Sequence, residues 1–245
     1  MYDLFYFAGV VLLGYIVLGI TGFGSALIIV PLLAWRWPLP DVVALVLLLD
    51  VPASLLLGGL NMHLVNFAEL RRLLPGIMVG VISGAWLVGV LDTRWPLLAL
   101  GLYVTAVGAQ ALRPLIVQRQ MLAPRWSYAA GGAIGVVEML FGSAGPLAVA
   151  WLGRRLPDVH ALRASTPVVI AVSACSVLLA MGWAGRLSQP SLWLSWLGLL
   201  GVAALGVLIG NRWARHVPPE LLRKIVCGLL VVSGLTLAVH AIQQG

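Results

Sequence analysis

Long stretches without a charged residue limit what this chain can fold into more than any other feature of its sequence. The first lies between Asp3 and Arg36. Five more follow, between Arg72 and Asp92, Arg94 and Arg113, Arg163 and Arg186, Arg186 and Arg212, and after Lys224. As a helix that rises ~1.5 Å per residue, each stretch can cross the roughly 30 Å hydrocarbon core of a bilayer.

Two further apolar stretches are each interrupted by one acid, Asp50 in the first and Glu138 in the second. With these the chain has eight hydrophobic segments. Since 61% of its residues are hydrophobic and only 9% are charged, it lacks the polar surface that a water-soluble domain needs. The sequence therefore predicts an all-α, polytopic protein of the cytoplasmic (inner) membrane.

The basic residues do not indicate nucleic-acid binding, although the formal net charge is +7. All of them lie in short connections between apolar segments, where they face lipid headgroups and set orientation. Cys175 and Cys227 lie inside apolar segments, where a small buried hydrophobic role is expected. We therefore expect no disulfide, metal site or cofactor.

Two short motifs recur at nearly the same spacing. Residues 23–26 (Phe-Gly-Ser-Ala) recur at 141–144, and residues 39–42 (Leu-Pro-Asp-Val) recur at 156–159, with offsets of 118 and 117 residues. Matching motifs at matching places among the apolar segments indicate two copies of a four-segment unit. We predict a first repeat over 1–116, a cytoplasmic linker over 117–126 and a second repeat over 127–245.

The distribution of Lys and Arg favours inverted repeats. If all eight segments cross the membrane, the two sides collect 6 and 9 basic residues. If the first and fifth segments return to the side they came from, the two sides collect 3 and 12 basic residues. Cytoplasmic connections carry an excess of Lys and Arg, so the side with 12 is predicted to be the cytoplasm and both termini to lie outside. Each repeat then crosses three times, so the two copies point in opposite directions. Kinked, full-length spans remain the alternative.

The first and fifth segments each carry a sequence that interrupts a helix. Residues 19–25 contain several glycines, and residues 138–146 end in a proline, which favours a first helical turn. A helix N-terminus inside the membrane carries a partial positive charge and free N–H groups, so two such ends can hold an anion. The alternative is that these glycines only allow close helix packing. The predicted substrate-binding residues are Thr21, Gly22, Phe23, Gly24, Ser25, Phe141, Gly142, Ser143, Ser165 and Thr166. The last two align with the region of Asp50 in the first repeat, so polar groups precede a proline in both copies.

Asp50 and Glu138 are the ionisable side chains inside the predicted spans, where a charge costs roughly 2.5 kcal/mol or more. We predict that Glu138, and secondarily Asp50, take up protons and couple anion movement to them. The alternative is a neutral acid that is hydrogen-bonded to neighbouring backbone. Arg154, Arg155 and Arg163 are interpreted as topology signals that can also gather anions at a cytoplasmic mouth.

With Thr-Gly-Phe-Gly-Ser at 21–25 and Phe-Gly-Ser-Ala-Gly-Pro at 141–146, the chain resembles the TauE/SafE family of sulfite exporters. The resemblance implies export of a small sulfur-containing anion, such as sulfite, sulfoacetate or a related organosulfonate, driven by the proton gradient. It places the family motif on Gly22, Phe23, Gly24, Ser25, Pro31, Phe141, Gly142, Ser143 and Gly145. Ser25 and Ser143, followed by Ala26 and Ala144, depart from the glycine-richer family pattern.

Other functions fit the sequence less well. A passive anion channel or an uptake carrier of the same fold stays open, since residue types do not set direction. An intramembrane hydrolase built on Ser143 needs a base within hydrogen-bond reach, and no His lies well inside a predicted span. We therefore expect a transporter rather than an enzyme, with a small anion, protons and the bilayer as its partners.

Overall fold

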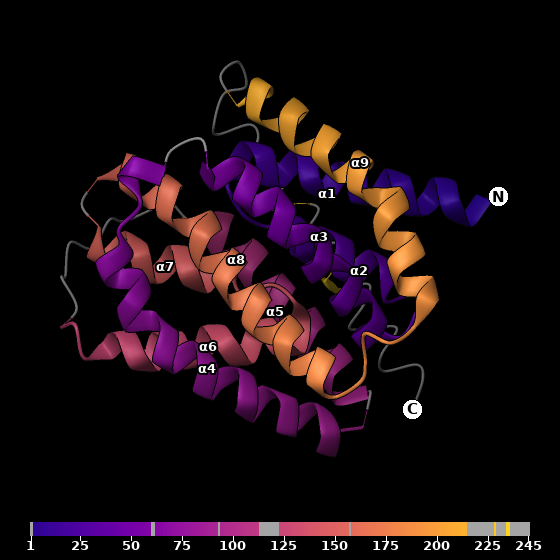
Figure 1. Cartoon of the computed structure of the whole chain (residues 1–245), viewed down its shortest axis with the longest axis horizontal. Helices are drawn as coiled ribbons and strands as arrows, with labels where there is room; N and C mark the ends of the chain where they lie inside the picture. Colours follow the sequence, from indigo (N-terminus) through magenta and orange to yellow (C-terminus); the bar gives the residue numbers. More distant parts are fainter. Residues whose placement is uncertain are drawn as a thin grey trace.

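The computed structural model describes residues 2–59, 62–92, 94–112, 123–156, 158–214, 228 and 234–235, and all the regular elements in this part of the chain are helices. The helices are α1 (Tyr2–Thr21), α2 (Ser25–Leu33), α3 (Leu39–Gly59), the short η1 (Met62–Leu64), α4 (Phe67–Val90), α5 (Arg94–Leu112), α6 (Trp126–Phe141), α7 (Gly145–Arg155), α8 (Val159–Trp183) and α9 (Pro190–Trp213) (Figure 1). Most of the predicted linker and of the eighth segment, including Cys227, lies outside the described residues.

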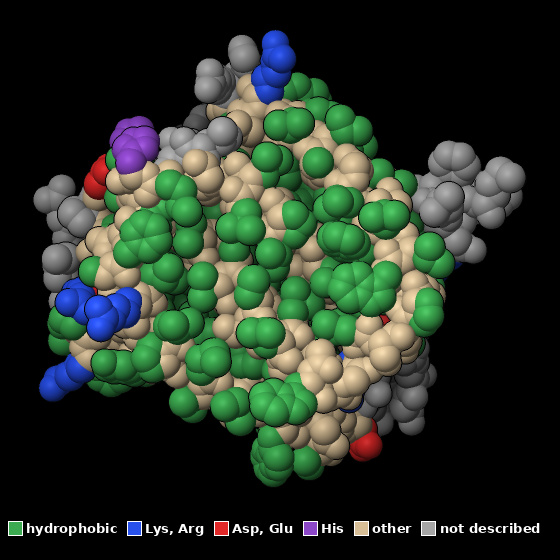
Figure 2. Space-filling view, in the orientation of Figure 1, with side chains coloured by type: hydrophobic (Ala, Val, Ile, Leu, Met, Phe, Trp, Pro, Cys, Tyr) green, Lys and Arg blue, Asp and Glu red, His purple; other side chains and the backbone are tan. Residues whose placement is uncertain are grey.

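The described helices fit a membrane protein. Four of them are long and apolar enough to cross a bilayer, namely Leu39–Gly59, Phe67–Val90, His160–Trp183 and Pro190–Trp213. Apolar side chains cover most of the face seen in Figure 2, while Lys and Arg side chains lie toward its edge. Since a bilayer offers no water to unpaired backbone groups, helices satisfy those groups within each segment. The all-helical, multi-pass prediction is confirmed at this level.

Glycines bring helices from the two parts of the sequence into close contact. On α4, a side chain at Gly80 would collide with the carbonyl oxygen of Gly132 on α6. On α9, a side chain at Gly210 would collide with the carbonyl oxygen of Ile16 on α1. The α4–α6 and α1–α9 pairs run side by side in Figure 1, and α3 packs against α8. Close backbone approach at small residues is how helices gain packing in lipid.

Both glycine motifs interrupt a helix where the sequence predicts. Between α1 and α2, Gly22 and Gly24 have φ values of 85° and 97°, and between α6 and α7, Gly142 has a φ of 63°. These left-handed conformations are readily adopted by glycine but strained for residues with a Cβ. In the first interruption the Thr21 hydroxyl also donates to the Val17 carbonyl at 2.8 Å, at the end of α1.

Each interrupted segment folds back on itself. At the outer end of the first, the Tyr6 hydroxyl on α1 donates to the Leu32 carbonyl on α2 at 3.0 Å. At the outer end of the second, Glu69 of α4 contacts both Ser127 at the start of α6 and Arg155 at the end of α7. The outer ends of each pair therefore lie together, and the interruption forms the tip of a V. We call these the α1–α2 and α6–α7 hairpins.

Candidate functional site

The tips of the two hairpins meet at one small cavity. Its volume is ≈ 10 Å³, room for about one water molecule. The lining residues come from both hairpins, α3 and α8: Leu18, Gly24, Ser25, Ala26, Asp50, Glu138, Gly142, Ser143, Ala144, Gly145 and Ile170. Of the predicted site residues, the structure thus brings together Gly24, Ser25, Asp50, Glu138, Gly142 and Ser143.

Asp50 anchors the first hairpin to α3. It is 2% exposed, and its Oδ1 accepts hydrogen bonds from the Tyr15 hydroxyl at 2.7 Å and the Ser25 hydroxyl at 2.8 Å. Tyr15 belongs to α1, and Ser25 is the first residue of α2. One carboxyl group therefore holds both sides of the interruption. Sequence reasoning missed Tyr15, although a tyrosine deep in an apolar segment requires a partner for its hydroxyl.

Glu138 also lines the cavity, and only one of its two carboxyl oxygens accepts a hydrogen bond from a described residue. The residue is fully buried, and its Oε2 accepts a hydrogen bond from the backbone N–H of Ala144 at 2.6 Å. Its Oε1 is buried without a hydrogen-bond partner among the residues that the structure describes. A buried polar atom left without a partner in an apolar interior is costly, so a water, a proton or a ligand next to Oε1 would lower that cost.

Two helix N-termini face this cavity. The helix α2 begins at Ser25 and α7 begins at Gly145, with Ala144 as its N-cap and Pro146 in its first turn. Each carries the partial positive charge of its first backbone N–H groups. The sequence predicts that these N–H groups are free, but Glu138 already accepts the Ala144 N–H. The lining therefore combines the N-termini of two helices with an acid that accepts one of their N–H groups.

Tyr103 of α5 supports the second tip from outside the cavity lining. Its hydroxyl donates to the Ser143 carbonyl at 2.9 Å, and its ring lies against Phe141 with centroids 5.8 Å apart and planes at 23°. Sequence analysis did not single out this residue, because its partners are about 40 residues away. The contact gives a hydrogen-bond donor to the Ser143 carbonyl, which lies between the end of α6 and the start of α7.

The remaining predicted residues lie elsewhere. Thr21 closes the end of α1, and Phe23 packs near Gly145 without lining the cavity. Ser165 accepts a hydrogen bond from the Asn66 backbone N–H at 2.9 Å, and the Thr166 hydroxyl donates to the Leu162 carbonyl at 2.8 Å. The structure also leaves Gly22 and Phe141 out of the lining. The residue of α8 that lines the cavity is Ile170.

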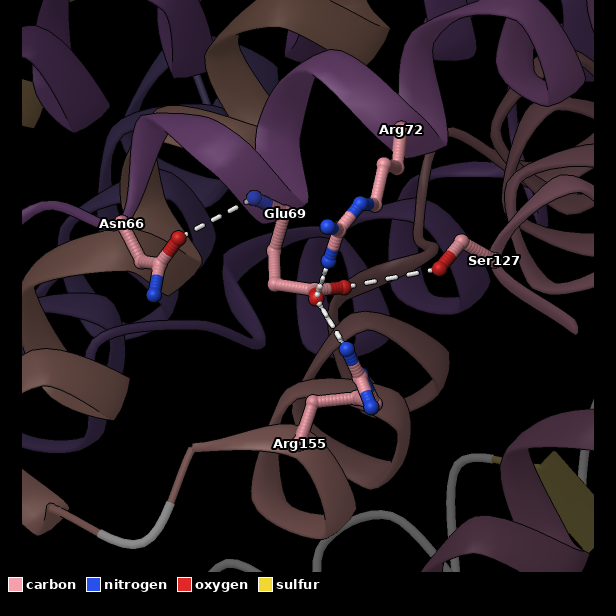
Figure 3. Close-up of polar contacts among 5 residues, drawn as sticks. All are labelled: Asn66, Glu69, Arg72, Ser127 and Arg155. Atoms are coloured by element: carbon pink, nitrogen blue, oxygen red, sulfur yellow. Dashed lines mark hydrogen bonds and ion pairs between the residues drawn. The ribbon is translucent and has the colours of Figure 1, made fainter. Parts of the chain in front are cut away.

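A cluster of ionic contacts closes the outer end of the α6–α7 hairpin (Figure 3). Glu69, in the first turn of α4, is 3% exposed. Its Oε1 accepts from Arg155 Nε at 3.1 Å, Arg155 Nη2 at 2.6 Å and Arg72 Nη1 at 2.8 Å. Ser127 donates to Oε2 at 3.4 Å, and Asn66 caps the helix by accepting the Glu69 N–H at 3.0 Å. Arg155, interpreted from the sequence as a topology signal, thus has a buried partner that sequence analysis missed.

Comparison with known proteins shows the family of this chain. The description of the matching family is sulfite exporter TauE/SafE, and the match covers residues 6–237. The probable inner membrane transporter protein TsaS of Comamonas testosteroni is 45% identical over 197 residues, which cover 80% of this chain and 82% of that protein. No solved structure matches the chain. This chain is therefore a membrane transporter that belongs to the TauE/SafE family of sulfite exporters.

Proposed function

We propose that this protein is a secondary transporter that exports a small sulfur-containing anion across the inner membrane and couples the movement to protons. The substrate class is sulfite, sulfoacetate or a related organosulfonate. The observation that carries the proposal is the buried Glu138, whose Oε2 accepts the Ala144 N–H at the start of α7. Its Oε1 has no hydrogen-bond partner in the described part of the chain. This acid lies in a cavity that both hairpin tips line.

The choice of an anion follows from the cavity lining. It holds the first residues of two helices and the hydroxyls of Ser25 and Ser143, and it contains no Lys or Arg among the described residues. Backbone N–H groups at helix N-termini bind oxyanions without a buried basic side chain. Sulfite and sulfonates present several oxygens to such donors. The sulfur chemistry itself comes from the family.

Proton coupling follows from competition at one N–H group. An anion that binds the start of α7 needs the Ala144 N–H, which Glu138 occupies. If Glu138 stays ionised, two negative charges share a site of low dielectric, where their repulsion is strong. If Glu138 takes up a proton, the repulsion disappears and its hydrogen bond to the Ala144 N–H weakens, so that an anion can displace it. Anion binding and protonation therefore favour each other, with Asp50 as a second acid in the same cavity. The anion and the proton then move in the same direction, so export is driven by a high concentration of the anion inside the cell and not by the inward proton gradient.

The proposed transporter consists of two inverted repeats, 1–116 and 127–245, with a cytoplasmic linker over 117–126. The folded-back hairpins support this arrangement, because a segment that returns to its own side leaves three crossings in each repeat. Helix pairing supports it as well, since α4 of the first repeat packs on α6 of the second and α9 of the second packs on α1 of the first. Under this topology the Glu69–Arg155 contact faces the cytoplasm.

The structure corresponds to a closed state in this proposal. A cavity with room for about one water cannot contain a sulfite ion, so at least one hairpin has to move during transport. The α6–α7 hairpin is held at its outer end by the Glu69–Arg155 ion pair. The α1–α2 hairpin is held by the Phe7 and Trp37 rings, whose centroids are 3.9 Å apart. Release of one contact at a time gives alternating access, whereas a passive channel requires an open path.

Ligand binding to purified protein in detergent tests the substrate class. Thermal stabilisation is measured with sulfite, sulfoacetate, sulfolactate, taurine and acetate at two pH values. The proposal expects stabilisation by sulfite or a sulfonate that differs between the two pH values, and it expects Glu138→Gln to lose that difference. Indifference of the wild-type protein to every one of these compounds contradicts the proposed substrate class.

A further inference from the structure

One peptide group connects Tyr103 to Glu138. The peptide bond between Ser143 and Ala144 offers its carbonyl oxygen to the Tyr103 hydroxyl at 2.9 Å and its N–H to Glu138 Oε2 at 2.6 Å. In a trans peptide, the C=O and N–H groups point in opposite directions. The described residues contain no cis peptide bond. A donor that fixes the carbonyl on one side therefore aims the N–H on the other.

The backbone alone does not fix the orientation of this peptide group. It lies outside regular helix, since α6 ends at Phe141 and α7 begins at Gly145. Gly142, just before it, has a φ of 63°, and glycine has more freedom to change its backbone angles than any other residue. Within a bilayer, a carbonyl without a protein donor cannot accept a hydrogen bond from water instead. Tyr103 supplies that donor, and its stacking on Phe141 limits where the hydroxyl can lie.

We propose that Tyr103 is a positioning residue for the transported anion: its hydroxyl holds the Ser143 carbonyl so that the Ala144 N–H points into the cavity. This inference rests on the proposed function, because it takes the Ala144 N–H as a donor to the substrate. Tyr103 acts through the peptide group and does not contact the anion itself. Linked hydrogen bonds also polarise one another, so the Tyr103 contact makes the Ala144 N–H a stronger donor.

The substitution Tyr103→Phe isolates the hydroxyl, because it keeps the ring that lies against Phe141. Tyr128→Phe is the matched control, since it removes the same atom from an exposed ring on α6. In proteoliposomes, the initial rate of transport is measured against sulfite and sulfoacetate concentration. Tyr103→Phe is expected to raise KM about tenfold with a smaller change in the maximal rate, since a misaligned donor weakens binding. Tyr128→Phe is expected to leave both unchanged.

A second measurement does not depend on transport. In protein carrying isotope-labelled alanine, the amide proton of Ala144 reports its hydrogen bond to Glu138 by magnetic resonance. Tyr103→Phe is expected to move this resonance upfield, and Tyr128→Phe is expected to leave it in place. An unchanged KM or an unmoved Ala144 resonance in Tyr103→Phe overturns the positioning role. If the resonance moves but the wild-type protein transports neither anion, the orientation by Tyr103 stands and the proposed function fails.

Discussion

Arg155, the last residue of α7, donates two hydrogen bonds to one carboxylate oxygen of Glu69, in the first turn of α4. The pair joins segments 86 residues apart in the sequence. Its side chains are 11% and 4% exposed, so solvent screens the attraction only weakly. The other end of α7 lines the cavity. A short, rigid helix thus connects the cavity to a buried ion pair.

Removal of Arg155 is expected to destabilise the protein more than removal of its neighbour. Loss of one partner from a buried pair costs roughly 3–5 kcal/mol, and the remaining Arg72 contact keeps the loss near the lower value. Arg154→Ala removes an exposed arginine from the next position. Melting in detergent compares the two variants. Equal melting temperatures for Arg155→Ala and Arg154→Ala contradict a structural role for the pair.

The left-handed conformation of Gly142, at the tip of the α6–α7 hairpin, is expected to be required for transport. A residue with a Cβ costs about 1–2 kcal/mol in the left-handed region, so Gly142→Ala strains the tip and re-aims Ser143. Gly185 is the matched control, because it has a similar φ of 71°, against 63° for Gly142, and lies in the α8–α9 turn. Both variants are expected to lose similar stability, and only Gly142→Ala to lose flux. Equal flux in the two variants refutes this prediction.

Close packing of α4 on α6 is expected to tolerate no side chain at its contact points. Gly80→Ala places a methyl group against the Gly132 carbonyl, and overpacking of this kind costs about 1–3 kcal/mol. Gly89, on the same helix, has nothing within 4 Å of the added Cβ, so Gly89→Ala gains helix propensity without a clash. Melting temperature is the readout. A Gly80→Ala variant as stable as Gly89→Ala contradicts the packing described.

The proposed topology predicts from which side each connection can be labelled. In a background without Cys175 and Cys227, Arg36→Cys at the α1–α2 hairpin is expected to react with a membrane-impermeant maleimide only from outside. Arg125→Cys, before α6, is expected to react only from the cytoplasm. Both arginines are exposed. Labelling of Arg36→Cys from the cytoplasmic side excludes the returning first hairpin.

The features that sequence analysis predicted are those with local causes. Glycine at 22, 24 and 142 interrupts a helix because of its own backbone preferences, and Pro146 favours the start of the next helix. Asp50 and Glu138 were found because an acid in an apolar segment is costly unless it has a role. Both acids line the cavity between the tips.

The features that it missed depend on contacts between distant segments. Neither Tyr103 nor Glu69 belongs to a motif, and each becomes significant only when its partner, Ser143 or Arg155, is brought near by the fold. For Ser165 and Thr166, the repeat gives the position along the helix but not the direction of the side chain. That direction depends on helix packing. The Ser165 and Thr166 hydroxyls form hydrogen bonds with Asn66 and Leu162, which do not line the cavity.

Flux in proteoliposomes under an imposed pH gradient is the most direct test of proton coupling at Glu138. Vesicles with equal sulfoacetate or sulfite on both sides are given a pH gradient, and accumulation of the anion on one side is followed with and without a protonophore. We expect accumulation that the protonophore abolishes, and we expect Glu138→Gln to retain exchange of the anion but to lose the accumulation. Accumulation by Glu138→Gln equal to wild type, or no response of the wild-type protein to the gradient, contradicts proton coupling at this site.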